Sequence, residues 1–338
     1  MINQVYRLIS TRQIRSDFVD IDIDDHSVIV RPTYLSICAA DQRYYTGSRG
    51  RVIMKQKLPM ALIHEAVGEV VYDPKGQYQV GTNVVMVPNT PTEKNDIIKE
   101  NYLRSSKFRA SGFDGFMQNV VNMDRNLIIP FNLQPRVAVL LELTSVVMNA
   151  IENFKKHSHS KKDTIGIWGN GNLGFIAALL LKKMYPDSKI IVFGVQEHKM
   201  AYFSFVDETY LINAIPDDLR VDHAFECVGG KASEAAINQI IDYINPQGTI
   251  SMMGVSENKI EINTRMVLEK GLLLLGNSRS NYNDFKKSVE FLEKYPEACE
   301  YLSTIISEEV TVRSLEDIYM AFDNDLNNDF KTIMKWEI

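Results

Sequence analysis

The feature that constrains this chain most is a glycine-rich hexapeptide, Gly169-Asn170-Gly171-Asn172-Leu173-Gly174, which has the spacing G-x-G-x-x-G. An apolar, strand-like segment, TIGIW, precedes it, and a helix-like segment, GFIAALLLKK, follows it. The first glycine permits a tight bend, the second lets a pyrophosphate approach the backbone, and the third lets the helix pack on the strand. Free N–H groups at the helix start also favour an anion. In this context the motif predicts more than a tight turn, namely a dinucleotide site formed by Gly169, Gly171, Asn172, Leu173 and Gly174.

The rest of the chain shows two kinds of pattern. Residues 1–145 contain short strand-like segments separated by turns, such as SVIVRPTYLSI and NVVMVPN, which indicates a β-rich, barrel-like domain. From 146 to 280, strands alternate with helical stretches, which is typical of a parallel, doubly wound sheet. Residues 281–338 are helical and charged and end in a strand-like segment, KTIMKWEI. We assign this tail to the first domain, so the prediction is an α/β protein with an inserted nucleotide domain. The lysine-rich stretch 155–162 is interpreted as a solvated linker.

Composition and charge exclude several classes of protein. The 338 residues are 45% hydrophobic and 24% charged, an ordinary globular composition. A net charge of −6 and a pI near 5.6 argue against nucleic-acid binding. No apolar stretch has the length of a signal peptide core or a membrane span, which predicts a cytoplasmic protein. The three cysteines lie far apart, which excludes a disulfide scaffold and a four-cysteine zinc lobe.

The end of the second nucleotide-domain strand indicates which dinucleotide binds. NAD sites usually carry an acidic residue there, which holds the ribose 2′-hydroxyl. This chain has Val192-Phe193-Gly194-Val195-Gln196 at that place. Gly194 leaves room for a 2′-phosphate and His198 or Lys199 can meet its charge, so we expect NADPH. Glu197 argues against this, and an alternative interpretation of Lys199 is an exposed helix cation.

Four side chains of the first domain suit a catalytic zinc ion: Cys38, the adjacent pair His64 and Glu65, and Glu142. A thiolate, an imidazole and a carboxylate are a plausible tetrahedral set that leaves one position for water or substrate. Zinc in such a site polarises a carbonyl group. Residue types alone leave a simpler alternative, because a lone cysteine is usually a small buried hydrophobe and a His-Glu pair usually lies on the surface.

Longer motifs resemble those of the medium-chain, zinc-dependent alcohol dehydrogenases. Cys38-Ala39-Ala40-Asp41 resembles their Cys-x-Ser/Thr-Asp motif, and segment 63–70, IHEAVGEV, is similar to their Gly-His-Glu-x-x-Gly signature. Segment 141–146, LELTSV, resembles the Glu-Pro-Leu-Ser-Val stretch of the polyol dehydrogenases, and 112–116, GFDGF, a Gly-Gly-x-Ala-Glu-Tyr region. The dinucleotide motif and segment 226–229, ECVG, follow in the expected order. The resemblance spans nearly the whole chain and implies a GroES-like catalytic domain and a Rossmann domain.

This resemblance implies roles for the candidate metal site. Cys38, His64 and Glu65 become predicted zinc ligands. Glu142 is then either the fourth ligand or a hydrogen-bond partner of the water on the metal, and the two carboxylates can exchange roles. Asp41 is expected to orient His64, as imidazoles that bind a metal generally require.

Two departures from the family pattern change the prediction. The family's structural zinc lobe carries four closely spaced cysteines, whereas residues 89–112 here have none, which implies one zinc ion per chain. Ala40 stands where a Ser or Thr usually begins the proton relay. The relay then uses Glu65 or Glu142 with a water on the metal, or else Tyr44, and the sequence leaves these alternatives open.

Within the family, the segments CAADQRYYTGSR, PNTPTEK and HAFECVGG resemble the bacterial ribulose-5-phosphate reductases. This resemblance implies NADPH-dependent reduction of D-ribulose 5-phosphate to D-ribitol 5-phosphate for teichoic-acid or capsule precursors. A phosphorylated substrate requires cations, and guanidinium groups suit phosphate because they bind two oxygens at once. The candidates are Arg43, Arg49, Arg51, Lys55, Arg109 and Arg279. Arg43 is the first choice, and most of the others have the alternative interpretation of ordinary surface groups.

Other functions and partners stay open at this stage. A dehydrogenase of an unphosphorylated polyol such as sorbitol or xylitol would share the metal and the fold, and a noncatalytic binding protein could keep the fold alone. The resemblance implies a homodimer and an association with a ribitol-5-phosphate cytidylyltransferase. Cys227 and Val228 are expected near the nicotinamide without reacting, Trp168 is assigned to packing, and Cys299 suggests no function.

Overall fold

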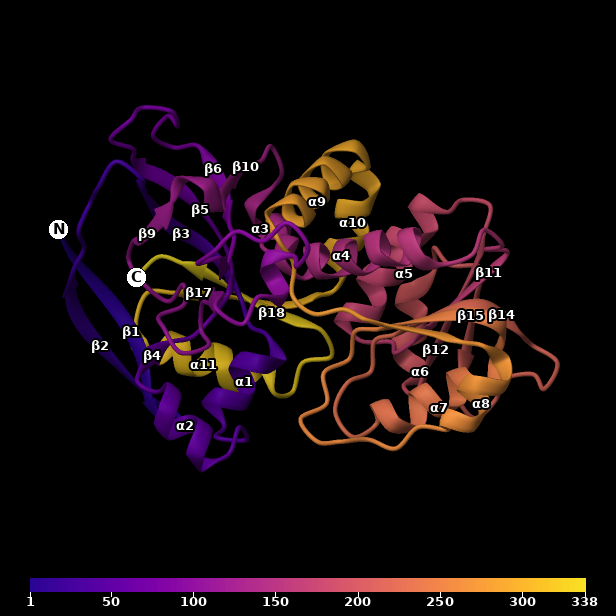
Figure 1. The fold of residues 1–338 in the computed structure, drawn as a ribbon. Coiled ribbons are helices and arrows are strands. Elements are labelled where there is room, and N and C mark those ends of the chain that lie inside the picture. Colours follow the sequence, from indigo (N-terminus) through magenta and orange to yellow (C-terminus); the bar gives the residue numbers. More distant parts are fainter. The chain divides into compact units, whose positions relative to one another are not determined.

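The computed structural model describes residues 1–338, which divide into two units. The first unit comprises residues 1–145 and 280–338, and the second comprises residues 146–279. Helix α4 (Leu141–His157) begins in the first unit and ends in the second (Figure 1). The interpretation of residues 155–162 as a linker is therefore wrong in part, because Lys155 and Lys156 belong to this helix. In addition, Lys161 pairs with the buried Asp222 at 2.9 Å.

The first unit contains a seven-stranded sheet, which agrees with its predicted β-rich character. Its order is β10-β6-β5-β3-β18-β17, with β9 also paired to β3. The strands are β3 (Ser27–Ser36), β5 (Glu65–Tyr72), β6 (Asn83–Met86), β9 (Val121–Asp124), β10 (Ile128–Pro130), β17 (Ile306–Val312) and β18 (Lys331–Trp336). The C-terminal strand β18 lies beside β3, which brings the tail of the chain into the first unit.

Two small sheets and six short helices complete the first unit. An N-terminal hairpin of β1 (Ile2–Ser10) and β2 (Gln13–Asp20) pairs with β4 (Met60–Ala61), and β7 (Asn89–Thr90) pairs with β8 (Lys107–Phe108). The helices are α1 (Ala39–Tyr45), α2 (Arg51–Lys57), α3 (Pro135–Ala138), α9 (Tyr282–Lys294), α10 (Pro296–Thr304) and α11 (Leu315–Asp325), with 3-10 turns at Glu100–Tyr102 and Arg125–Leu127. Helices α9 and α11 both begin at capping boxes, which satisfy their first N–H groups.

The second unit contains a six-stranded parallel sheet in the order β13-β12-β11-β14-β15-β16. The strands are β11 (Thr164–Trp168), β12 (Lys189–Gly194), β13 (Glu208–Leu211), β14 (Val221–Glu226), β15 (Ile244–Met252) and β16 (Leu273–Gly276). Strands β12 and β13 lie on one side of β11, and β14, β15 and β16 lie on the other side. This order confirms the predicted doubly wound fold, and ligands of such sheets bind where the order reverses.

Helices cover both faces of this sheet (Figure 1). They are α5 (Asn172–Met184), α6 (Glu197–Met200), α7 (Ser233–Tyr243) and α8 (Thr264–Lys270), with a 3-10 turn at Ala201–Phe203. Ile237 of α7 shares a buried cluster with Ala224 of β14, whereas the ring of Phe154 in α4 lies 5.2 Å from that of Phe225. Successive residues of a strand point to opposite faces, so α7 and α4 lie on opposite sides of β14.

No helix of the chain combines the length and the hydropathy that crossing a bilayer requires.

His223 is buried within β14, and both of its ring nitrogens form hydrogen bonds. The Thr249 N–H donates to Nδ1 at 3.1 Å, so Nε2 carries the proton and donates to the Lys161 carbonyl at 2.9 Å. Burial, reinforced by the neighbouring His159 ring, lowers the pKa of His223 to about 4. The unfolded chain, in which histidine has its ordinary pKa of about 6.5, therefore binds this proton more readily.

We predict that His223 makes the second unit less stable in mild acid. Its contribution to the free energy of unfolding is complete above a pH of about 6.5 and falls by about 3 kcal/mol as the pH drops towards 4. Urea unfolding of His223→Gln should show a correspondingly weaker pH dependence than the wild-type protein. His26→Gln, which alters an exposed histidine, is the control. Equal pH dependence in the wild-type protein and His223→Gln would contradict this prediction.

Candidate active site

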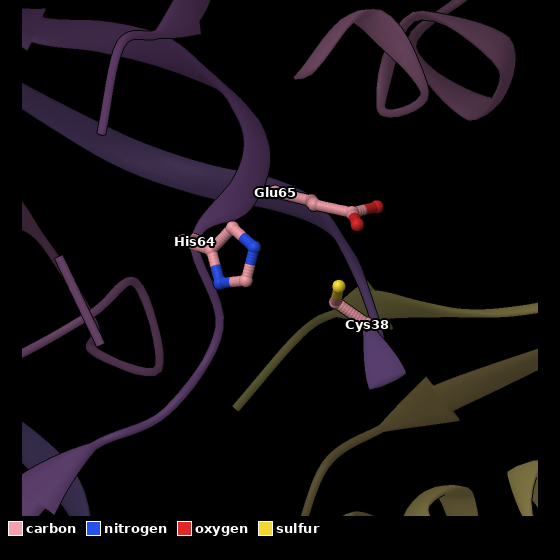
Figure 2. A group of neighbouring side chains, drawn as sticks. All are labelled: Cys38, His64 and Glu65. Atoms are coloured by element: carbon pink, nitrogen blue, oxygen red, sulfur yellow. The ribbon is translucent and has the colours of Figure 1, made fainter. Parts of the chain in front are cut away.

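Cys38, His64 and Glu65 come together in the first unit, where β3 ends and β5 begins. Antiparallel pairing of Ser36 with Glu65 brings these two strand ends side by side. The sulfur, one ring nitrogen and one carboxylate oxygen lie within 4.8 Å of one another. Figure 2 shows the three side chains converging on one point. His64 and Glu65 are buried and Cys38 is partly buried, so the group is shielded from bulk water.

Asp41 organises the backbone around this group. It is the third residue of α1 and forms a capping box with Cys38, whose N–H donates to Oδ2 at 3.2 Å. The Ile63 N–H donates to Oδ1 at 2.9 Å, and Oδ2 lies 3.6 Å from His64 Nδ1. Ile63 has a φ of +70°, which is unusual for a β-branched residue and marks a strained segment. One buried carboxylate thus holds both Cys38 and the residue before His64.

The surroundings of His64 favour a positive charge. Burial alone would lower the pKa of His64, but the Asp41 carboxylate and the Cys38 sulfur outweigh it, and the pKa lies well above its usual value. Negative groups that stabilise a proton here would also stabilise a metal cation in its place. Because thiolate, imidazole and carboxylate are the ligand types of zinc, the chemistry of this group fits that ion.

Lys331, at the start of β18, belongs to this site and was missed by the sequence analysis. Its Nζ donates to both carboxylate oxygens of Glu65 at 2.7 Å and to the Ile37 carbonyl at 3.0 Å. Burial opposes the charge on Lys331, but Glu65 outweighs it and raises the pKa of the lysine. Lys331 therefore keeps its positive charge beside the carboxyl group of Glu65. No local pattern could reveal it, because the two residues lie 266 positions apart in the chain.

Glu142 lies near this group but is not one of the three side chains within 4.8 Å of one another. It is buried in the first turn of α4. Burial raises its pKa to about 7; Glu65 and Asp41 add to this rise, and His64 and Lys331 oppose it. The structure thus brings three predicted ligands together, and the fourth, Glu142, is close enough for their charges to change its pKa.

Two of the predicted phosphate-binding arginines flank Tyr44. Tyr44 is buried in α1, and the Arg49 guanidinium lies 4.8 Å from the centre of its ring. Arg43 is half-buried in the same helix, and its carbonyl accepts the Arg49 N–H at 3.3 Å. Arg51 and Lys55 lie on α2 and are exposed. Arg43 therefore lies within the helix that Cys38 caps, and Arg49 lies in the turn that follows this helix.

The other two arginines have different surroundings. Arg109 donates to the carbonyls of Asp114 at 3.2 Å and Asn122 at 3.1 Å, and burial lowers its pKa to about 10. The structure therefore gives Arg109 a role in bracing the backbone, in place of the predicted role in phosphate binding. Arg279 is half-buried in the second unit, and its carbonyl accepts a hydrogen bond from Asn149.

The glycine motif connects β11 to α5. Gly169 has a φ of +120°, and a Cβ on Gly174 would collide with the Gly169 carbonyl oxygen. At Gly171, the N-cap of α5, no atom lies within 4 Å of the place a Cβ would take. The backbone at Gly171 is thus open to a ligand, and the N–H groups of Asn172 and Leu173 are among those that a helix leaves without intrahelical partners.

Gly194, at the end of β12, serves a neighbour within the protein. A Cβ on Gly194 would collide with the side chain of Asn170, whose Nδ2 donates to the Gln196 carbonyl at 2.8 Å. The missing side chain therefore makes room for Asn170, in place of the predicted 2′-phosphate. His198 is exposed and Lys199 is buried, so the interpretation of Lys199 as an exposed helix cation is wrong.

A buried glutamate, Glu226, organises the loop after β14 and was also missed. Its carboxylate accepts four hydrogen bonds of 2.9–3.1 Å, from the N–H groups of Val228, Gly229 and Gly254 and from the hydroxyl of Ser233. Cys227 is buried, which raises the pKa of its thiol and keeps it protonated, whereas Val228 is 38% exposed. All four partners of Glu226 are hydrogen-bond donors, so the loop after β14 is held together by a side chain with two acceptor oxygens.

The fold and these side chains define a class of protein. Residues 24–133 match the alcohol dehydrogenase GroES-like domain, and residues 135–336 match the glucose dehydrogenase C-terminus. The chain belongs to the medium-chain alcohol dehydrogenase family, which confirms the resemblance of its motifs.

Particular relatives are much more similar. The ribulose-5-phosphate reductase of Bacillus spizizenii is 54% identical over 341 aligned residues, which cover 100% of both chains. Ribulose-5-phosphate reductase 1 of Staphylococcus aureus is 54% identical and covers 99% of both chains. The crystal structure of S. aureus TarJ in complex with NADPH superposes with a TM-score of 0.90 at 48% identity and covers 100% of both chains.

We predict that Lys331 supports the site mainly when no metal is bound. Lys331→Met leaves the Glu65 carboxylate buried without its cation, which should lower the free energy of unfolding of the chelated protein by about 3–5 kcal/mol. Zinc should then raise the unfolding midpoint more in this variant than in the wild-type protein. Lys335→Met, on the same strand but with a side chain 43% exposed, is the control and should change little. A Lys331→Met protein as stable as the wild type would show that the pair does not have this role.

Proposed function

We propose that this protein is an oxidoreductase that reduces D-ribulose 5-phosphate to D-ribitol 5-phosphate with NADPH. The observation that carries the proposal is the 54% identity, over the full length, to two ribulose-5-phosphate reductases, in a chain that assembles a zinc-type ligand group. In the overall reaction a hydride passes from NADPH to C2 of the ketose, and a proton is added to the C2 oxygen.

Cys38, His64 and Glu65 would hold one zinc ion, with Glu142 as the alternative carboxylate. Zinc, when bound, supplies a Lewis acid that polarises a carbonyl group. The chain's own contribution is to exclude water through burial of His64 and Glu65 and to fix Cys38 and His64 through Asp41. Such fixed, shielded groups need little reorganisation during a reaction.

The proton requires another side chain, because Ala40 has no hydroxyl group. Both oxygens of Glu65 accept hydrogen bonds from Lys331, which leaves Glu142 and Tyr44 as the proton carriers among the residues predicted from the sequence. The buried position of Glu142 near Glu65 supports Glu142, whereas the ring of Tyr44 lies beneath Arg49.

NADPH would bind along the loop from Gly169 to Gly174, with Gly171 providing open backbone. The similarity to S. aureus TarJ, whose structure contains NADPH, supports this cofactor. Position 194 is a glycine, whereas NAD sites usually carry an acidic residue there, and this difference also supports NADPH. We place His198 near the 2′-phosphate and Cys227 and Val228 near the nicotinamide.

Arg43 and Arg49 would bind the substrate phosphate, with Arg51 and Arg279 as further candidates. A dehydrogenase of an unphosphorylated polyol is the second candidate function, and it would need neither arginine. The names of the two reductases favour the phosphorylated ketose.

The proposal extends to the cellular setting. We place the protein in the cytoplasm, in the synthesis of teichoic-acid precursors, where a ribitol-5-phosphate cytidylyltransferase would use its product. We also propose a homodimer. The edge strand β16 supports it, because Leu273 is 38% exposed there and the outer backbone groups of an edge strand can pair with a second copy.

An assay with a small substrate panel tests the proposed reaction. Oxidation of NADPH should be fast with D-ribulose 5-phosphate and at least tenfold less efficient, in kcat/KM, with free ribulose or fructose, a difference of about 1.4 kcal/mol. Chelation should abolish the activity and zinc should restore it. Equal efficiency with free ribulose would instead support the polyol dehydrogenase.

Replacement of Arg43 tests the phosphate site. Arg43→Ala should raise the KM for D-ribulose 5-phosphate at least tenfold, about 1.4 kcal/mol, and should leave free ribulose unaffected because that substrate has no phosphate. Arg265→Ala, which removes a cation 85% exposed on α8, should change neither value. An unchanged KM for the phosphate ester would remove Arg43 from the site.

A further inference from the structure

Glu226, the last residue of β14, is completely buried, and every hydrogen-bond donor to its carboxylate is an uncharged group. Burial of a carboxylate without a cation costs free energy, and several N–H or O–H donors must offset that cost. A residue with no charge could fill the same space more cheaply. The origin of the four donors therefore indicates what the carboxylate does.

The two oxygens of Glu226 bind two different loops. Oε1 accepts the N–H groups of Val228 at 2.9 Å and Gly229 at 3.1 Å, and the Ser233 hydroxyl at 3.0 Å, all of which follow β14. Oε2 accepts the N–H of Gly254 at 3.0 Å, in the loop that follows β15. The same N–H lies 3.2 Å from the carbonyl oxygen of Glu226. Glu226 thus bridges the loops after β14 and β15.

Gly254 is the counterpart of this bridge. Its φ lies outside the left-handed region, so the backbone conformation alone does not require a glycine. A Cβ on Gly254, however, would collide with both carboxylate oxygens of Glu226 and with the nitrogen of Gly229. The Gly230 N–H also donates to the Val255 carbonyl at 2.9 Å, which links the two loops a second time. The two loops therefore pack closely around the carboxylate.

The bridged loops lie beside the dinucleotide motif. Trp168, Glu226 and Met252 are level with one another in the parallel sheet, so the segments after β11, β14 and β15 leave the sheet at one edge. This is the carboxyl edge, where such sheets bind dinucleotides. A Cβ on Gly169 would lie 3.0 Å from the carbonyl oxygen of Cys227, so the loop after β14 packs directly on the motif.

We infer that Glu226 is a positioning residue for the cofactor, which fixes the two loops as one wall for the nicotinamide half of NADPH. The inference rests on the proposed function, which supplies the cofactor and places Val228 near the nicotinamide. Because Glu226 is completely buried, it acts through the backbone of the two loops. The adenosine half would bind near Gly194, at the end of β12, and β12 lies on the opposite side of β11 from β14. Loss of the bridge should therefore weaken one half of the cofactor and spare the other.

The test measures two dissociation constants in Glu226→Gln, that of NADPH and that of 2′,5′-ADP, which is the adenosine part alone. Glutamine keeps one oxygen for the donors after β14, but its NH2 group then faces the N–H of Gly254. The substitution therefore breaks the link to the loop after β15. We expect the Kd for NADPH to rise by about tenfold or more, and the Kd for 2′,5′-ADP to stay the same.

Two further variants complete the test. Gly254→Ala disturbs the same bridge from the other loop, so it should also raise the Kd for NADPH and leave that for 2′,5′-ADP unchanged. Asp222→Asn is the matched control, because Asp222 is 3% exposed at the start of the same strand and its carboxylate also binds three donors. It should lower the thermal unfolding midpoint and change neither Kd.

Equal weakening of NADPH and 2′,5′-ADP in Glu226→Gln would overturn the inference, since the carboxylate would then stabilise the whole unit. No change in either Kd, or the same selective loss in Asp222→Asn, would overturn it too. Failure of the proposed function would appear in the wild-type protein instead. A wild-type protein that binds NADPH without reducing D-ribulose 5-phosphate would contradict the proposed reaction alone, whereas one that binds no NADPH would overturn both.

Discussion

The buried ion pair between Glu65 and Lys331 is the interaction on which the catalytic unit depends. It joins the first residue of β5 to the first residue of β18, on either side of β3. Without the cation, the buried carboxyl group of Glu65 would lose the positive partner that binds both of its oxygens. The C-terminal tail therefore does more than add a strand to the sheet of the first unit. Its residue Lys331 supplies a positive charge that stabilises the buried ligand group before a metal binds.

Features that depend on neighbouring residues could be predicted from the sequence. The turn from β11 to α5 needs Gly169 because its φ is +120°, and it needs Gly174 because a Cβ there would collide with the Gly169 carbonyl oxygen. Adjacent positions bring His64 and Glu65 together, and the capping box explains the spacing of Cys38 and Asp41. The alternation of strands and helices after residue 146 predicted the parallel sheet, since each apolar strand must be followed by a helix that covers it.

Features that depend on distant contacts could not be predicted. Lys331 resembles any strand lysine until the sheet order places it beside Glu65. The β1–β2 hairpin escaped prediction because β2 has a single buried residue, Ile14, and so lacks an apolar alternation. The interpretation of Gly194 assigns the space beside this residue to the 2′-phosphate of the cofactor, whereas the side chain of Asn170 fills that space.

A single zinc ion held by Cys38, His64 and a carboxylate is the central claim, and X-ray absorption at the zinc edge tests it most directly. The purified protein should contain one zinc ion per chain with one sulfur neighbour at about 2.3 Å and nitrogen or oxygen neighbours at about 2.0–2.2 Å. The sulfur neighbour should be lost in Cys38→Ser. A spectrum with no sulfur or with several sulfur neighbours, or a protein that retains no zinc, would contradict the claim.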